Sequence, residues 1–144
     1  MTKGDLAKQY FLQGNNCSNS VILAFQKEIG LPEQDLKRLG IGFGGGFARK
    51  RLICGAVSGM NMVLSYLLSD GEDKLKIYTI IQKAIERFEK EVGSIICADL
   101  LEGKVKVETT PAPDKRTEEY YKKRPCQELC KLAGDIVEDI LNNK

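Results

Sequence analysis

The feature that most constrains the fold is the apolar segment at residues 53–68. It would be hydrophobic on nearly every side of a helix, and Ser58, Asn61 and Ser65 are the polar residues that interrupt it. The segment is also too short for a comfortable membrane span. A helix that is apolar all round needs neighbours on all sides. Residues 54–68 are therefore expected to form a buried helix at the centre of the fold.

Apolar residues recur at helical spacing along most of the chain, whereas candidates for short strands are almost absent. The sequence therefore predicts an all-α fold, a bundle of five or six helices around the central apolar helix. With 144 residues, 42% of them hydrophobic, the chain is expected to form a single domain over residues 1–144. The helices are expected at about residues 5–12, 17–29, 32–39, 54–68, 73–92 and 126–141, with one or two further turns at 95–101.

Two segments interrupt this helical pattern. Residues 40–46 carry five glycines, which predicts a loop over residues 40–48. The run spells G-x-G-x-x-G, but a dinucleotide site also needs a preceding strand and a parallel sheet, which the sequence does not predict. Bare glycine backbone can instead approach a ligand and direct N–H groups at it, so Gly44 and Gly45 are candidate cofactor contacts. Residues 102–115, a polar stretch with two prolines, are predicted to be a second loop.

The composition excludes several classes of function. The chain contains no histidine, which removes Cys-His and Ser-His dyads, His-ligated zinc, the facial triad of non-haem iron and attached haem of the Cys-x-x-Cys-His type. A formal net charge of +2, with both signs interspersed, leaves no large basic face for nucleic acid. The amino terminus has acidic and polar residues where a secretory signal needs an apolar stretch, so a cytoplasmic location is expected.

The remaining candidates for chemistry are the five cysteines, Cys17, Cys54, Cys97, Cys126 and Cys130. In the cytoplasm they are not expected to form a disulfide framework. The first four are expected at or near helix starts, where free N–H groups and the helix dipole favour a thiolate and lower its pKa. Cys126 and Cys130 lie four residues apart and share one helix face, so one is interpreted as active and the other as spare. Each cysteine taken alone also fits the alternative of a small buried core residue.

Five short motifs follow one another along nearly the whole chain: NCSNSVILAF (16–25), GFGGGFAR (42–49), CGAVSG (54–59), GSIICADLL (93–101) and RPCQELCKLA (124–133). Together they resemble the C_GCAxxG_C_C family, whose members are described as redox-active. The resemblance implies a small α-helical protein defined by four cysteines. Gly55, Ala56 and Gly59 match the small residues of the central motif.

The resemblance further implies a cofactor, because a related domain occurs in split-Soret cytochromes, where an iron–sulfur site has been proposed. The family cysteines match Cys17, Cys54, Cys97 and Cys126, with Cys130 as the substitute ligand. The expected function is electron transfer or redox sensing through an iron–sulfur cluster of the two-iron kind. The cytochrome part is lacking, and without histidine the chain cannot supply bis-His haem ligation.

Two alternatives stay open. In a cofactor-free thiol–disulfide protein, Cys54 would be the attacking nucleophile and another cysteine would resolve the disulfide. A non-enzymatic protein would use four thiolates to hold structural zinc, or would be a helical partner-binding module. The sequence does not identify the redox partner protein, does not decide whether the protein is an enzyme, and leaves homo-oligomerisation open.

Overall fold

The computed structural model describes residues 1–143, and the regular elements in that part of the chain are all helices. The prediction of an all-α fold is therefore confirmed. The helices are α1 (Lys3–Leu12), α2 (Cys17–Ala24), α3 (Gln26–Ile29), α4 (Glu33–Gly40), the 3-10 helix η1 (Ile41–Phe43), α5 (Gly44–Phe47), α6 (Gly55–Leu68), α7 (Lys74–Val92), α8 (Cys97–Leu101), α9 (Glu118–Lys123) and α10 (Cys126–Asn142).

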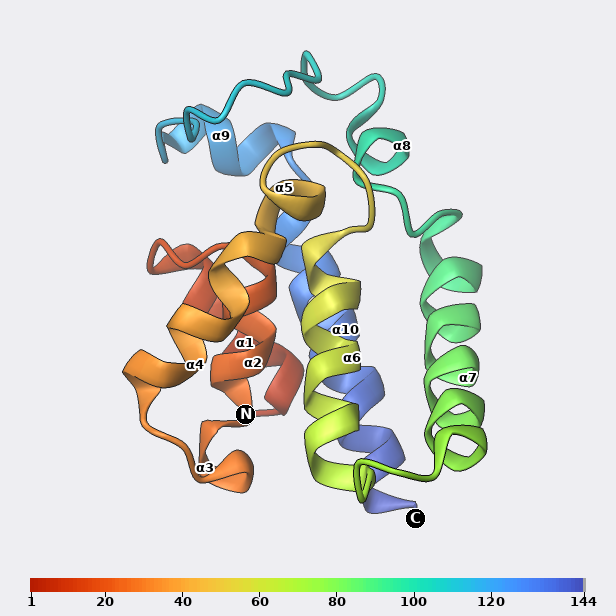
Figure 1. The fold of residues 1–144 in the computed structure, drawn as a ribbon. Helices are drawn as coiled ribbons and strands as arrows, with labels where there is room; N and C mark the ends of the chain where they lie inside the picture. Colours follow the sequence, from red (N-terminus) through yellow and green to blue (C-terminus); the bar gives the residue numbers. More distant parts are fainter. Residues whose placement is uncertain (144) are drawn as a thin grey trace.

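Helix α6 lies at the centre of the fold (Figure 1), where it packs against α2, α7 and α10. Its side chains at Val57, Met60 and Leu64 are completely buried, as expected for the central apolar helix. Helix α1 packs against α2 and α10 and completes the core. In the part of the chain that the structure describes, no helix has both the length and the apolarity that crossing a bilayer requires.

Two glycines allow α6 to approach α2 closely. A Cβ atom added at Gly59 would lie 2.7 Å from the carbonyl oxygen of Ser18, and one added at Gly55 would lie 3.0 Å from the Cβ atom of Cys17. Larger side chains at these positions would push the two helices apart. The small residues therefore bring the start of α6 against the start of α2, which places Cys54 near Cys17.

The structure divides the helix expected at residues 17–29. Helix α2 ends at Ala24, the backbone leaves helical geometry at Phe25 (φ −110°, ψ 18°), and α3 continues in a new direction. Apolar periodicity survives such a bend, so the sequence alone did not reveal it. Helix α9 was not predicted, because its six residues, Glu118–Lys123, are too few and too polar to show a helical period.

The glycine segment is more structured than the loop expected at residues 40–48. After η1, positive φ angles begin inside the single turn of α5, at Gly45 and Gly46, and continue through residues 47–49, with φ of 66°, 54° and 70° at those three. Non-glycine residues in this left-handed region cost about 1–2 kcal/mol each. Backbone hydrogen bonds from Arg51 to Gly45 (3.1 Å) and from Leu52 to Gly46 (2.9 Å) hold the turn in place.

Candidate functional site

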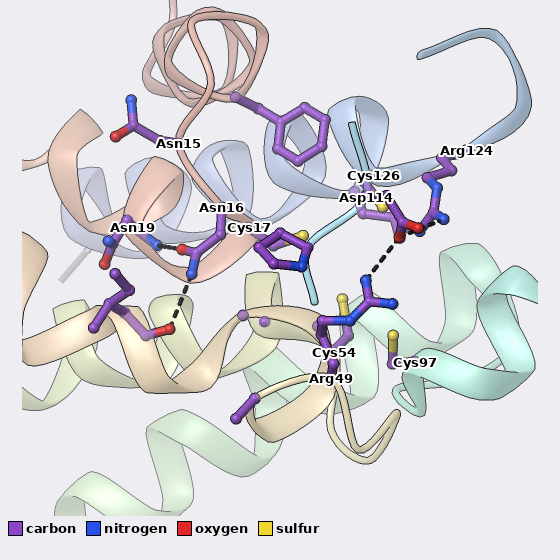
Figure 2. A pocket seen from close by; sticks show the side chains of 18 of the residues that line it. Asn15, Asn16, Cys17, Asn19, Arg49, Cys54, Cys97, Asp114, Arg124 and Cys126 are labelled. Carbon is purple, nitrogen blue, oxygen red and sulfur yellow. Dashed lines mark hydrogen bonds and ion pairs between the residues drawn. The ribbon is translucent and has the colours of Figure 1, made fainter. Parts of the chain in front are cut away.

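Four cysteines line one cavity of about 600 Å³ at the end of the bundle where α2, α6, α8 and α10 begin. Cys17, Cys97 and Cys126 are the first residues of α2, α8 and α10, and Cys54 immediately precedes α6. They come from four separate segments of the chain, and Figure 2 shows them around the same cavity. The expectation that these cysteines stand at helix starts is therefore confirmed.

Backbone pairing places Cys54 beside Cys97. The amide of Cys54 donates to the carbonyl of Ile95 (2.7 Å), and the amide of Cys97 donates to the carbonyl of Leu52 (2.6 Å). These bonds flank an isolated antiparallel bridge between Ile53 and Ile96. The chain before α6 and the chain before α8 thus run alongside each other, which explains why residues 43 positions apart meet.

Polar side chains hold the start of α2 in position. The Asn16 side chain accepts a hydrogen bond from the amide of Asn19 (3.0 Å), which caps the helix, and donates one to the carbonyl of Ile41 (3.0 Å). The Ser18 hydroxyl donates to the carbonyl of Gly40 (2.7 Å). The glycine segment is thereby tied to the helix that begins at Cys17.

Cys17, Cys126 and Cys130 form a second group of thiols. The thiols of Cys17, Cys126 and Cys130 lie close enough to shift one another's pKa, and the Cys130 thiol donates to the carbonyl oxygen of Cys17 at 3.8 Å. Cys130 is completely buried and does not line the cavity, whereas Cys126 does. The structure thus places Cys126 at the cavity wall and Cys130 one turn deeper in the core.

The thiols do not have the lowered pKa values expected from their positions at helix starts. Burial raises the pKa of Cys54 to about 12, although the nearby backbone amides of Ala56 and Val57 oppose this. Burial also raises the pKa of Cys97, with partial compensation by Arg51. A thiolate in this site would lose the hydration that favours it in water, and this loss outweighs the helix-start effect.

The same direction holds for the second group of thiols. The contact with Cys17 and burial together raise the pKa of Cys126 well above its ordinary value. For Cys17, the contact with Cys126 lowers the pKa, but the contact with Cys130 and burial outweigh it. In the absence of a bound group, these cysteines are therefore neutral thiols at physiological pH.

Arginines and one aspartate complete the cavity wall. The Arg51 side chain is only 6% exposed and its guanidinium lies 3.7 Å from the sulfur of Cys97. Asp114, in the segment at residues 102–117 that has no helix or strand, pairs with Arg49 (2.7 Å) and Arg124 (2.9 Å). Sequence analysis did not single out Asp114 or Arg124, because neither belongs to a recognised spacing. The position of Arg124 two residues before Cys126 was the one available signal.

The glycine segment forms another part of the wall. Gly44 and Gly45, the candidate cofactor contacts, line the cavity. Gly46 lies directly against α8, since a Cβ atom there would come within 2.7 Å of the Cβ atom of Cys97. Glycine is thus needed at this position both for its positive φ of 72° and for the space.

The donor atoms of the site fit some metal centres better than others. Among residues 1–143, no three Cys, Asp or Glu side chains are arranged to hold a single metal ion. The four cysteines fall instead into the pairs Cys54 with Cys97 and Cys17 with Cys126 on one cavity. Thiolates are the ligands that iron–sulfur clusters use, and a cluster binds its ligands at more than one metal atom. The four thiols are therefore of the ligand type that an iron–sulfur group requires.

Comparison with known proteins identifies one family. The family model described as "Putative redox-active protein (C_GCAxxG_C_C)" matches residues 15–140. The match spans all five cysteines, the glycine segment and the segment at residues 102–117. Searches of curated proteins and of solved structures found no match.

Proposed function

Because the chain belongs to the C_GCAxxG_C_C family of redox-active proteins, we propose that it transfers electrons or senses redox state through a two-iron iron–sulfur cluster. The ligands in this proposal are Cys17, Cys54, Cys97 and Cys126. The observation that carries it is the convergence of these four thiols, from four separate chain segments, on one cavity. When bound, such a cluster supplies a one-electron redox centre.

The charge distribution of the cavity supports a group that is bound through thiolates. Four thiolates would bring four negative charges into a largely buried site, and the raised pKa values of the free thiols reflect that cost. The Arg51 guanidinium, which points at the Cys97 sulfur from 3.7 Å, stabilises negative charge there. Hydrogen bonds and charges at cluster sulfurs also set the reduction potential. Arg51 is therefore the residue expected to tune the potential.

A second candidate function, cofactor-free thiol–disulfide chemistry, is supported by the proximity of Cys17 and Cys126 on the cavity wall. Cys54 was its expected nucleophile, but a pKa of about 12 leaves almost no thiolate at neutral pH. A structural zinc site lacks support from the arrangement of the ligands. All five cysteines are free thiols, in keeping with the reducing cytoplasm that we propose as the location.

Anaerobic purification tests the proposed function. The wild-type protein should be brown and contain about two iron and two sulfide per chain, with an electron paramagnetic resonance signal after reduction by dithionite. Cys54→Ser should abolish iron and sulfide, while Cys130→Val, which changes a deeper thiol to a residue of similar volume, should retain them. Both variants should be checked by circular dichroism for unchanged helicity.

Each other result has a definite meaning. A colourless protein that forms a reversible intramolecular disulfide would replace the cluster by thiol–disulfide chemistry. Stoichiometric zinc without sulfide would replace it by a structural metal site. Loss of iron in Cys130→Val but not in Cys126→Ser would transfer the fourth ligand position to Cys130.

A further inference from the structure

We propose that the cavity contains an oxyanion-binding subsite, formed by Arg49, Arg51 and Arg124, which takes a small carboxylate or phosphate in exchange for Asp114. This subsite lies beside the thiols and goes beyond the proposed cluster. It uses guanidinium groups, not sulfur atoms, and its occupant is a diffusible ligand. Figure 2 shows the Asp114 carboxylate next to Arg49 and Arg124 at the cavity wall.

The three guanidinium groups converge on a single oxygen atom. The Oδ2 atom of Asp114 lies 2.7 Å from Nη1 of Arg49, 2.9 Å from Nη2 of Arg124 and 3.9 Å from Nη2 of Arg51. These donors come from residues 49–51, directly after the glycine segment, and from the residue pair that precedes α10, so the fold itself assembles them. Asp114 thus occupies the position that an external carboxylate or phosphate oxygen would take.

One carboxylate does not balance the positive charge of this cluster. The side chains of Arg51, Arg124 and Arg49 are 6%, 10% and 13% exposed, so water screens them poorly. Three guanidinium charges against Asp114 leave an excess of two. Arg51 also faces the Cys97 sulfur, which is a neutral thiol in the free protein, and Asp114 is the one carboxylate paired with Arg49 and Arg124 among the described contacts. Buried charge without a counter-ion is costly, which favours an additional anion.

An unpaired donor identifies Arg124 as incompletely satisfied. Its Nε atom is buried and has no hydrogen-bond acceptor among the described residues, although the side chain lines the cavity. Arg116, in contrast, donates to the carbonyls of Phe11 (2.9 Å) and Asn15 (2.9 Å) and stacks over the Phe11 ring at 4.2 Å. Arg116 is therefore a structural residue. Arg124 also stacks over the Tyr120 ring at 4.5 Å, but its Nε atom is the free donor that a forked contact with an oxyanion would use.

Asp114 is held in a way that permits exchange. It is 32% exposed and lies in the irregular segment at residues 102–117, whose local attachments include bonds from Arg49 to the carbonyl of Thr110 (2.6 Å) and from Arg51 to the carbonyl of Glu108 (2.9 Å). Partial burial disfavours its charge, yet Arg49 and Arg124 hold the pKa of this carboxyl below its ordinary value. Exchange needs only the partly exposed Asp114 side chain to turn toward solvent, because the backbone of the segment stays attached through Arg49, Arg51 and Arg116.

The space available suits a small organic molecule. The cavity volume of about 600 Å³ falls within the range of small-molecule sites, about 300–1,000 Å³. Its wall combines the apolar Pro111, Pro113 and Leu101 with the three guanidinium groups. This combination is typical of sites that fix one charged end of a ligand and bury the remainder.

Isothermal titration of reduced, cluster-free protein at low ionic strength tests the subsite, with malonate and inorganic phosphate as separate probes. At least one of the two probes should bind the wild-type protein. Asp114→Asn should bind that probe about tenfold more tightly, because the internal competitor is removed. Arg124→Gln should weaken binding about tenfold. Asp139→Asn, which breaks the exposed pair with Arg87 (2.6 Å), is the matched control and should leave affinity unchanged.

The two probes distinguish the ligand source: tighter binding of malonate assigns a carboxylate, and tighter binding of phosphate assigns a phosphate. Absence of binding by both probes in wild-type protein and in Asp114→Asn would overturn the proposal, as would equal affinities in Arg124→Gln. Circular dichroism verifies folding, and Asp114→Ser serves as the second variant. Because the titration uses cluster-free protein, a lack of anion binding would not affect the interpretation of the iron and sulfide measurements. A lack of iron and sulfide would likewise leave the anion-binding result valid.

Discussion

Two regions of this bundle, the helical core and the cavity end, differ in the kinds of residues that they bury. The helical core, where α1, α6, α7 and α10 pack, consists of fully buried apolar side chains such as Met60, Phe88 and Val137. The cavity end, where α2, α6, α8 and α10 begin, contains buried polar residues such as Asn19 and Arg51 and the left-handed backbone at residues 45–49. Figure 1 shows the cavity end around α5, α8 and α9.

The difference teaches where stability and function reside. Apolar burial in the helical core stabilises the fold by about 25 cal/mol for each Å² removed from water. At the cavity end, left-handed non-glycine residues and buried guanidinium groups each cost free energy, and the core must offset them. Such costs persist in a protein when the strained arrangement serves a binding site.

The largest expected effect on stability comes from a substitution in the helical core. Phe88→Ala should lower the free energy of unfolding by about 3–5 kcal/mol, because it removes a completely buried ring. Tyr78→Ala on the same helix is the control, since that side chain is 58% exposed and should change stability by less than about 0.5 kcal/mol. Urea unfolding of both variants measures the difference. Equal effects would mean that α7 does not belong to the stabilising core.

Alkaline pH should act on the cavity end. The pKa of Cys54 is about 12 in the folded protein against an ordinary 9.0, so the folded state keeps its proton where the unfolded chain has lost it. The folded state binds more protons in this window, so Cys54 alone lowers stability as pH rises above about 9, by about 3 kcal/mol at pH 11, and the other thiols with raised pKa values add to the loss. Denaturant titrations of cluster-free protein at pH 8 to 11 measure this. A slope that persists unchanged in Cys54→Ala would assign it to other groups.

A smaller effect on stability distinguishes two glycines of the glycine segment. Gly46→Ala should destabilise the protein by about 2 kcal/mol, because φ is 72° and the new Cβ atom would lie 2.6 Å from the amide nitrogen of Leu52. Gly42→Ala should be nearly neutral, since a Cβ atom there meets nothing within 4 Å. Thermal melts of the two variants compare them. Comparable losses would show that the whole segment, and not its contact with α8, requires glycine.

The smallest effect probes an ordinary helix cap at the exposed start of α1. Thr2 and Asp5 form a capping box on α1, and Thr2→Ala should cost about 1 kcal/mol without reducing iron content. The bonds with Thr2 and Lys131 lower the pKa of Asp5 to about 2, so its stabilising contribution is present above its ordinary 3.8 and disappears as pH falls toward 2. Acid titration of wild type and of Asp5→Asn measures this, because the backbone amide of Thr2 still donates to Asp5 in Thr2→Ala: Asp5→Asn lacks the carboxylate and should have less stability to lose. An unchanged acid profile would remove the cap from the set of stabilising contacts.

Much of the fold was predictable because its signals are local. The apolar character of residues 54–68 predicted the central helix, and the positions of Cys17 and Cys126 after capping or proline residues predicted their helix starts. The site was predictable in its cysteines but not in Asp114 and Arg124. Those two meet only because the segment at residues 102–117 crosses the cavity, and no local pattern encodes that crossing.

The sequence by itself determined the helical class, the cysteines available for redox chemistry and the absence of histidine chemistry. Composition is a count that needs no structure, and periodicity depends only on residues that are close together in the chain. Tertiary structure decided which thiols share a cavity, that Cys126 and not Cys130 lines it, and that burial raises thiol pKa values at helix starts that alone would lower them. Desolvation and ion pairing depend on everything packed around a group. They are therefore properties of the assembled fold and not of any stretch of chain.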